Sequence, residues 1–329
     1  MMRALTLAAL LALGLVMFAA SLLVGYAPLG PGPALAALFG QGDPLTVIVM
    51  QDIRLPRALL AALVGAALGM SGAAMQGLLR NPLAEPGLIG VSGSAALGAV
   101  IALQTGIAGA FALALPVTAL LFAAGAVALL MALAGSRGGS LTLILAGIAV
   151  SSLAGALTSL VLNLSPNPYA AAEIVFWLLG SVADRSMEHV ALAAPLIFAG
   201  LAVLALTSRG LDSLTLGEDA AEALGVSMAR LRLMVLVGTA ASVGAATAVA
   251  GAIGFVGLVV PHLLRPLMRA RPGALLAASA LGGAAIVLAA DLAVRLILPD
   301  RDLKLGVVMA LIGAPLFLHL IYRTRKDLM

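Results

Sequence analysis

Residues 65–93 read GAALGMSGAAMQGLLRNPLAEPGLIGVSG, an apolar helical segment that breaks off abruptly after its middle. Gly65 and Gly69 lie four residues apart and Gly72 follows, so one face of the helix is nearly bare backbone. Such a face lets a second helix pack closely where lipid supplies no hydrophobic driving force. The Asn81-Pro82 pair then ends the helix, because proline disfavours helical geometry in the residue before it. The stretch predicts a tightly packed membrane helix that ends in an irregular turn.

A second break at Pro86-Gly87 prolongs the irregular turn. Irregular backbone at membrane depth is tolerated only where protein or a water-filled cavity covers it. We therefore predict that the turn belongs to a pathway wall or to a gate on the cytoplasmic side. A plain connection between two membrane spans is the alternative.

The composition of the whole chain supports a membrane location. Of its 329 residues, 63% are hydrophobic and only 10% are charged, and the mean hydropathy is +1.17. Soluble globular domains carry about 25% charged residues. The chain has no cysteine, which excludes disulfides and thiolate metal sites. We predict an all-α polytopic membrane protein that forms a single domain over residues 1–329.

Apolar runs long enough to cross a bilayer recur along the chain, bounded by charges, prolines or glycine clusters. The eighth run is short. Only a glycine-rich segment divides it from the seventh, so nine spans with one broken helix is an alternative to ten. The runs are 4–26, 58–79, 88–106, 109–134, 141–164, 190–207, 233–250, 252–264, 274–297 and 306–322.

The orientation follows from the basic residues, because cytoplasmic loops of membrane proteins collect Lys and Arg. With ten spans and both termini in the cytoplasm, twelve of the 18 basic residues lie inside and six outside. The net charge of +4 is therefore interpreted as a topology signal and not as a sign of nucleic-acid binding. The inner residues are Arg3, Arg80, Arg137, Arg209, Arg230, Arg232, Arg265, Arg269, Arg271, Arg323, Arg325 and Lys326, and the outer residues are Arg54, Arg57, Arg185, Arg295, Arg301 and Lys304.

The spans lack the residues that drive transport or catalysis. The first seven runs contain no Asp, Glu, Lys or Arg, although ion-coupled carriers place such groups at membrane depth. Asp291 and Arg295 lie four residues apart in the ninth run, which favours a locally neutralised pair. The chain has no phosphate-binding loop and no spacing typical of histidine metal ligands. We expect no catalytic site, no metal site and no cofactor, so the energy for any transport would have to come from elsewhere.

Two polar segments outside the spans suit binding partners. Arg54, Arg57 and Arg295 lie at the predicted outer face, against the positive-inside trend, and suit an acidic partner or, as the alternative, lipid headgroups. On the inner side, residues 208–232 form the longest polar stretch. Gly217-Glu218-Asp219 can open a short helix there and Gly225 can close it. That helix would dock a cytoplasmic partner, unless the stretch is a plain solvated connector.

These segments, in this order, resemble the permease family of bacterial ATP-binding-cassette (ABC) importers for iron–siderophore complexes, haem and cobalamin. The resemblance covers nearly the whole chain. The matching residues are Arg54-Leu-Pro-Arg57, Ser71-Gly72 through Gln76 to Arg80-Asn81-Pro82-Leu83-Ala84-Glu85-Pro86-Gly87, Leu145-Ala146-Gly147, Phe176-Trp177 with Gly180-Ser181, Leu216-Gly217-Glu218 with Ala220 and Leu224-Gly225, Gly254-Phe255-Val256-Gly257-Leu258 with Pro261-His262 and Arg265, and Gly313-Ala314-Pro315.

The resemblance implies a type II ABC importer permease fold that works as a homodimer in the bacterial inner membrane. It further implies two cytoplasmic ABC ATPase subunits, a periplasmic substrate-binding protein and alternating access driven by ATP. By the same resemblance, Arg54, Arg57 and Arg295 match the docking positions for the binding protein. Asn81 and Leu83 match one cytoplasmic gate and Ser140 and Leu141 the second, while Leu216, Gly217, Glu218, Ala220, Leu224 and Gly225 match the coupling helices that contact the ATPases.

Two other classes of protein are alternatives to this permease. A stand-alone ion-coupled secondary transporter predicts a charged site at membrane depth, and an intramembrane enzyme predicts a reactive pair in a cavity. The cargo is not encoded in the matched motifs, since siderophore, haem and cobalamin members share them. We expect subfamily-specific residues in the segment 165–177, between the fifth and sixth runs, but their pattern does not identify the cargo.

Overall fold

The computed structural model describes residues 2–25, 29–111, 113–135, 139–165, 168–297 and 303–327. These residues form helices and connecting turns, with no β-strand among them. The α-helices are α1 (Met2–Leu23), α2 (Pro31–Leu38), α3 (Pro44–Ile48), α4 (Leu55–Leu78), α5 (Val91–Gln104), α6 (Ala114–Ala134), α7 (Ser140–Asn163), α8 (Pro168–Leu178), α9 (Met187–Leu206), α10 (Ser208–Leu214), α11 (Glu218–Ala223), α12 (Met228–Ala250), α13 (Val256–Leu264), α14 (Pro272–Ile297) and α15 (Leu305–Asp327). A π-helical segment, Val49–Arg54, leads into α4, and short 3-10 turns lie at Pro86–Ile89 and Ile107–Gly109.

The predicted all-helical membrane fold is confirmed. Each of the ten apolar runs overlaps one α-helix, and seven described helices are long and apolar enough to cross a membrane. Val91–Gln104 and Leu305–His319 are shorter apolar helices, and α13 has only nine residues. The seventh and eighth runs form the separate helices α12 and α13, with positive φ angles at Gly251 and Phe255 in the break.

Three short helices lie in segments for which the sequence predicted no element. α2 and α3 follow the first span, and each starts with proline in its first turn, where the missing N–H costs nothing. Asp43 caps α3 by accepting a hydrogen bond from the Thr46 N–H at 3.1 Å. α8 occupies most of the segment 165–177, of which residues 166–167 lie outside the described part.

The glycine face of α4 lies at the centre of the bundle, as its spacing predicted. Gly65 packs on the backbone of Gly283 in α14, and a Cβ at either glycine would overlap the other's carbonyl. One turn further, Gly69 meets the carbonyl of Ser279 in the same way. The Ser71 and Ser242 hydroxyls hydrogen-bond at 3.0 Å between α4 and α12. Most of α4 is therefore buried among other helices.

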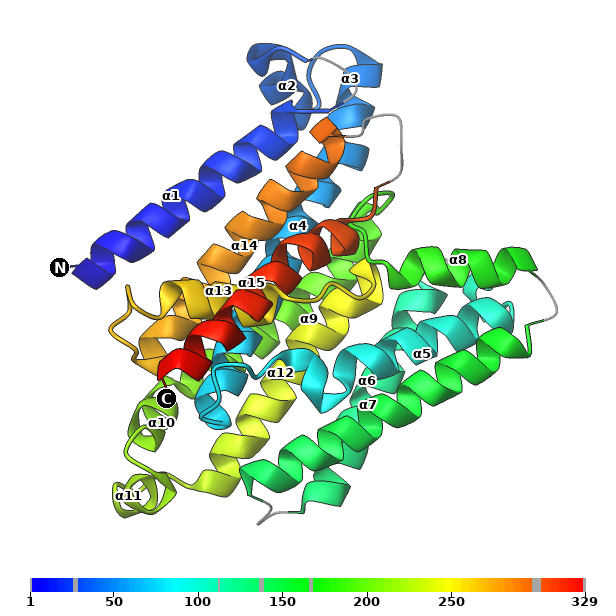
Figure 1. The fold of residues 1–329 in the computed structure, drawn as a ribbon. Coiled ribbons are helices and arrows are strands. Elements are labelled where there is room, and N and C mark those ends of the chain that lie inside the picture. Colours follow the sequence, from blue (N-terminus) through cyan, green and yellow to red (C-terminus); the bar gives the residue numbers. More distant parts are fainter. Residues whose placement is uncertain are drawn as a thin grey trace.

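The bundle has two distinct ends (Figure 1). α2 and α3 lie at one end beside the last turns of α14, while α10 and α11 lie at the other. α1 runs toward α2, and α15 runs back toward α10, so both termini face the α10–α11 end. The predicted outer and inner motifs thus lie at opposite ends. Arg137 and Arg301, two of the residues used for the orientation, lie outside the described residues.

Candidate functional site

The turn after α4 is bound to the break before α13, so two motifs far apart in the sequence form one unit. The Gln76 side-chain amide donates to the carbonyls of Gly257 and Leu258, both at 3.3 Å. The Glu85 carboxylate accepts the Phe255 N–H at 2.8 Å, where the chain enters α13. Phe255 itself has a φ of 67°, a left-handed conformation that bulky residues rarely adopt. These bonds join the end of α4 and the turn after it to the start of α13.

Glu85 is a partly buried acid outside the membrane spans. Burial raises the pKa of its carboxyl above the ordinary value, and the hydrogen bond from Phe255 lowers it in part. Folding therefore favours the protonated carboxyl. The resulting stability is complete below the ordinary carboxyl pKa of about 4.3 and is lost as the pH rises through the raised folded-state pKa.

The variants Glu85→Gln and Glu85→Ala separate the contribution of the hydrogen bond to stability from the contribution of the charge. The glutamine variant keeps an oxygen acceptor without titrating, so we expect its thermal stability in detergent to fall less than that of the wild type above about pH 4.3. The alanine variant leaves the Phe255 N–H without its acceptor and should lose about 1–3 kcal/mol at every pH. Equal stability of the two variants across the pH range would contradict this assignment.

The first predicted gate is a compact turn, and the second is more exposed. Asn81 accepts the Leu83 N–H on its side-chain oxygen at 2.9 Å, which stabilises the turn after α4. Leu141 is the second residue of α7 and is 69% exposed; the side chain of Ser140 lies outside the described set. The turn meets α7 further along that helix, where the Ser151 hydroxyl donates to the Gly87 carbonyl at 3.3 Å. Both predicted gate positions therefore adjoin α7, the second at the start of this helix and the first through the Ser151–Gly87 hydrogen bond.

The segment 208–232 contains the expected short helix. α11 starts after Gly217 and is followed by Gly225, both of which have positive φ angles. Glu218 of α11 forms an ion pair with Arg232 of α12, with a distance of 2.8 Å between Nη2 and Oε2. Among the predicted coupling residues, Leu216 and Leu224 are exposed and Ala220 is half-buried. The segment thus presents leucines to the surroundings while Glu218 holds it to the bundle.

The three outer arginines lie together, but not on an exposed rim as expected. Asp291 is 1% exposed and pairs with Arg57, at 2.8 Å, and with Arg295. Arg54 and Arg295 are 4% and 8% exposed, and both bind carbonyls at the C-terminal end of α1. Carbonyls at a helix C-terminus lack partners within the helix and carry partial negative charge, which attracts guanidinium groups. The predicted Asp291–Arg295 pair is confirmed, whereas the side chains of Arg54 and Arg295 face inward.

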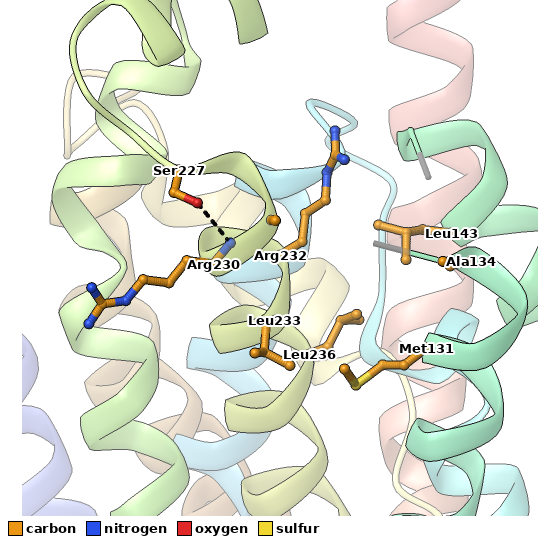
Figure 2. Close-up of a pocket in the computed structure, with 10 residues that line it drawn as sticks. Met131, Ala134, Leu143, Ser227, Arg230, Arg232, Leu233 and Leu236 are labelled. Carbon is orange, nitrogen blue, oxygen red and sulfur yellow. Dashed lines mark hydrogen bonds between the residues drawn. The ribbon is translucent and has the colours of Figure 1, made fainter. Parts of the chain in front are cut away.

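An apolar cavity of about 580 Å³ lies between α12, close to its start, the end of α6 and the start of α7. Figure 2 shows Met131 and Leu143 facing α12 across it, with Arg232 at its polar end and Arg230 directed to the far side of α12. The described residues contain no group of three or more side chains that could hold a metal ion. The cavity therefore offers room for apolar chain or lipid next to the α11 ion pair.

Sequence reasoning missed every contact that joins distant segments. The Arg57–Asp291 pair spans 234 positions and the Arg265–Gln76 hydrogen bond 189. One available signal was the presence of single polar residues in apolar runs, such as Gln76, because a buried amide needs partners. That signal indicates that a partner exists without identifying it.

Comparison with known proteins agrees with this geometry. The FecCD transport family matches residues 11–323. The chain is 38% identical to the ferric enterobactin transport system permease protein FepD of Escherichia coli (strain K12), covering 98% of this chain and 97% of FepD. It is 39% identical to the vitamin B12 import system permease protein BtuC of Vibrio cholerae, covering 93% and 90%.

A solved structure shares the same architecture. An inward-facing conformation of a metal-chelate type ABC transporter superposes with a TM-score of 0.85 at 36% identity, covering 96% of this chain and 98% of that one. Matches of this extent in sequence and in structure leave no large part of the chain unaccounted for. The chain belongs to the FecCD transport family, the permeases of ABC importers for siderophores, haem and cobalamin.

Proposed function

We propose that this chain is the membrane-spanning subunit of an importer that moves a metal chelate, either an iron–siderophore, haem or a corrinoid, into the cytoplasm by alternating access. Separate ABC ATPases would supply the energy. The observation that carries the proposal is the position of α11, which lies outside the bundle yet is tied to α12 through Glu218 and Arg232. A partner that moves α11 would therefore move α12, which packs directly against α4.

The partners follow from the surfaces at the two ends. The exposed Leu216 and Leu224 would supply an apolar contact for each ATPase. A second copy of the chain would complete a central pathway, with Asn81, Leu83, Ser140 and Leu141 as its cytoplasmic gates. Both termini would lie in the cytoplasm of a bacterial cell, the α2–α3 end facing the periplasm.

A periplasmic binding protein would dock at the α2–α3 end. Arg57 has the most accessible side chain of the three outer arginines, 17% exposed, and is the one we propose to contact an acidic partner directly. Arg54 and Arg295 would act indirectly, because they hold the end of α1 in place beside it. The same packing leaves Asp291 occupied by two guanidinium groups, which disfavours an ion-coupled carrier that would use it.

Reconstitution tests this function. The chain, co-expressed with ATPase subunits and incorporated into liposomes, is expected to take up a labelled chelate only with ATP and a binding protein. Uptake by the chain alone in an ion gradient would refute the proposal. ATPase activity that fails to respond to the binding protein would argue against docking at the outer end.

The same liposomes test the coupling assignment. Ala221 of α11 is fully buried against its neighbours, so Ala221→Asp should displace the helix and uncouple ATP hydrolysis from uptake. Glu222→Ala changes an exposed residue of the same helix and serves as the matched control, with wild-type coupling expected. Normal uptake by the Ala221→Asp variant would show that α11 does not transmit the motion.

A further inference from the structure

A small polar cavity lies at the inner end of the bundle, separate from the apolar cavity of Figure 2. It has a volume of about 160 Å³, about five times the share of liquid volume that one water molecule takes. The end of α4, the turn after α10, the loop after α13 and the start of α14 enclose it. Its polar lining consists of Gln76, Arg80, Thr215 and Arg265.

The cavity contains positive charge without a matching acid. Arg80 and Arg265 both line it, and no Asp or Glu is among its described lining residues. Neither arginine takes part in an ion pair within the described residues. Arg80 is exposed, whereas Arg265 is half-buried. Charges taken out of water are normally paired, because an unpaired ion there is unfavourable. The cavity thus has the charge that a bound anion would balance.

The Arg265 guanidinium is only partly satisfied by the described residues. Its Nη2 donates to the side-chain oxygen of Gln76, whose amide nitrogen is itself held by the carbonyls of Gly257 and Leu258. The Arg265 Nε is buried and has no hydrogen-bond partner among the described residues. A buried donor left unsatisfied is rare in native proteins and calls for a missing partner. The Gln76 bond holds the Arg265 guanidinium at the wall of the cavity.

The acid beside the cavity is already engaged. Asp212 lies in α10, three residues before Thr215, and its Oδ1 accepts the Gly273 N–H at 2.8 Å at the start of α14. It therefore caps α14 and does not line the cavity. The chain supplies no other described counter-ion among the lining residues.

We propose that this cavity is an oxyanion site, which takes a phosphate group on Arg265 and Arg80, from either free phosphate or the headgroup of an anionic lipid of the inner leaflet. A phosphate there would accept from the guanidinium groups of Arg265 and Arg80, which line the cavity. It would join the turn after α4 to the coupling segment and to the end of α13. The site would thus strengthen the connection between the predicted gate and the segment that the ATPases move, a consequence that rests on the proposed function.

The test uses the full chain in nanodiscs and measures its melting temperature. Inorganic phosphate is titrated at constant ionic strength in discs of phosphatidylcholine, and in a second arm phosphatidylglycerol replaces part of the lipid with no phosphate added. Arg265→Gln and Arg80→Gln remove the proposed ligands one at a time. Arg230→Gln removes an exposed arginine at the same end of the bundle that does not line this cavity, and serves as the control.

We expect a saturable stabilisation by phosphate, by phosphatidylglycerol or by both, and the arm that responds identifies the source. Arg265→Gln should weaken the response on the order of tenfold, the value of a charge-assisted hydrogen bond, and Arg230→Gln should not. Equal responses of the wild type and both cavity variants would overturn the proposal, as would an equal loss in the control. So would an Arg265 effect seen only with ATPase subunits bound, which would assign the cavity to a partner's carboxylate.

Arg80→Gln provides a second test of the site in case the Arg265→Gln variant does not fold. Arg80 is exposed and makes no ion pair within the described residues, so its substitution should leave the fold intact. A reduced response from Arg80→Gln alone would support the site. An unchanged response, together with an unfolded Arg265→Gln variant, would show that Arg265 is structural only and would overturn it.

Discussion

Asp291→Ala is expected to destabilise the folded chain by about 3–5 kcal/mol, the cost of removing one partner from a buried ion pair. Asp291 bonds directly to Arg57 and Arg295, and Arg54 is buried at the same end of the bundle. Without the carboxylate, these positive charges repel each other in a place that water does not reach. Since the stability of most domains is only about 5–15 kcal/mol, the variant should accumulate poorly in membranes.

The loss should concentrate at the C-terminal end of α1. Arg295 binds the Ser21 carbonyl and hydroxyl, and Arg54 binds the carbonyls of Leu22 and Leu23. Apolar side chains along α1 also pack against the bundle, and these hydrogen bonds add a polar attachment at the C-terminal end of the helix. We expect protease cleavage near residue 25 to increase in the variant before the bundle itself unfolds.

Asp52→Ala provides the control for Asp291→Ala. Asp52 is an exposed acid near the same end, and its removal should change the stability by no more than about 0.5 kcal/mol. Unfolding in mixed micelles measures both variants. Equal stability of the Asp291→Ala and Asp52→Ala variants would mean that the Asp291 carboxylate does not stabilise the folded chain through its arginine partners.

Gly72→Val is expected to cost about 3 kcal/mol or more, the upper part of the range for overpacking. A Cβ at Gly72 would overlap the backbone carbonyl and Cα of Gly257, closer than real Cβ atoms ever approach. Backbone cannot rotate away as a side chain can, so α13 would have to move. That motion would break the bonds from Gln76 to Gly257 and from Glu85 to Phe255.

Gly125→Val is the matched control for the glycine in α4. Gly125 also lies within a long spanning helix, α6, but a Cβ added there meets nothing within 4 Å. We expect its melting temperature to stay near that of the wild type. If both valine variants melt at the same temperature, close backbone approach at Gly72 does not limit the stability of the bundle.

Much of the architecture could be predicted because membrane helices leave local signals. Each span is an apolar run of nearly the required length, so the ten runs could be located without knowing their neighbours. The glycine spacing of residues 65–72 likewise showed which face of one helix would be closely packed. The short helices α2 and α3 escaped prediction because their residues 29–48 read as a Gly/Pro-rich connection with no long apolar run.

For the candidate sites, the sequence indicated where the charged residues lie but not which groups they bind. Arg54 and Arg295 were found as charges at the outer end, yet a one-dimensional pattern cannot distinguish an exposed arginine from one that binds the end of α1. α11 was predicted with its boundaries because Gly217 and Gly225 mark a local feature. Its attachment through Glu218 and Arg232 connects residues 14 positions apart across a turn and required the fold.

Composition, hydropathy and the placement of charges were sufficient to determine a polytopic helical membrane protein with distinct ends, because the bilayer imposes its constraint on each segment separately. Tertiary structure alone decided which polar groups satisfy one another. Asp291 gathers two arginines, Gln76 orients Arg265, and Glu85 caps α13. These pairings depend on contacts between segments up to 234 residues apart, and in a medium without water every such group must find its partner within the protein.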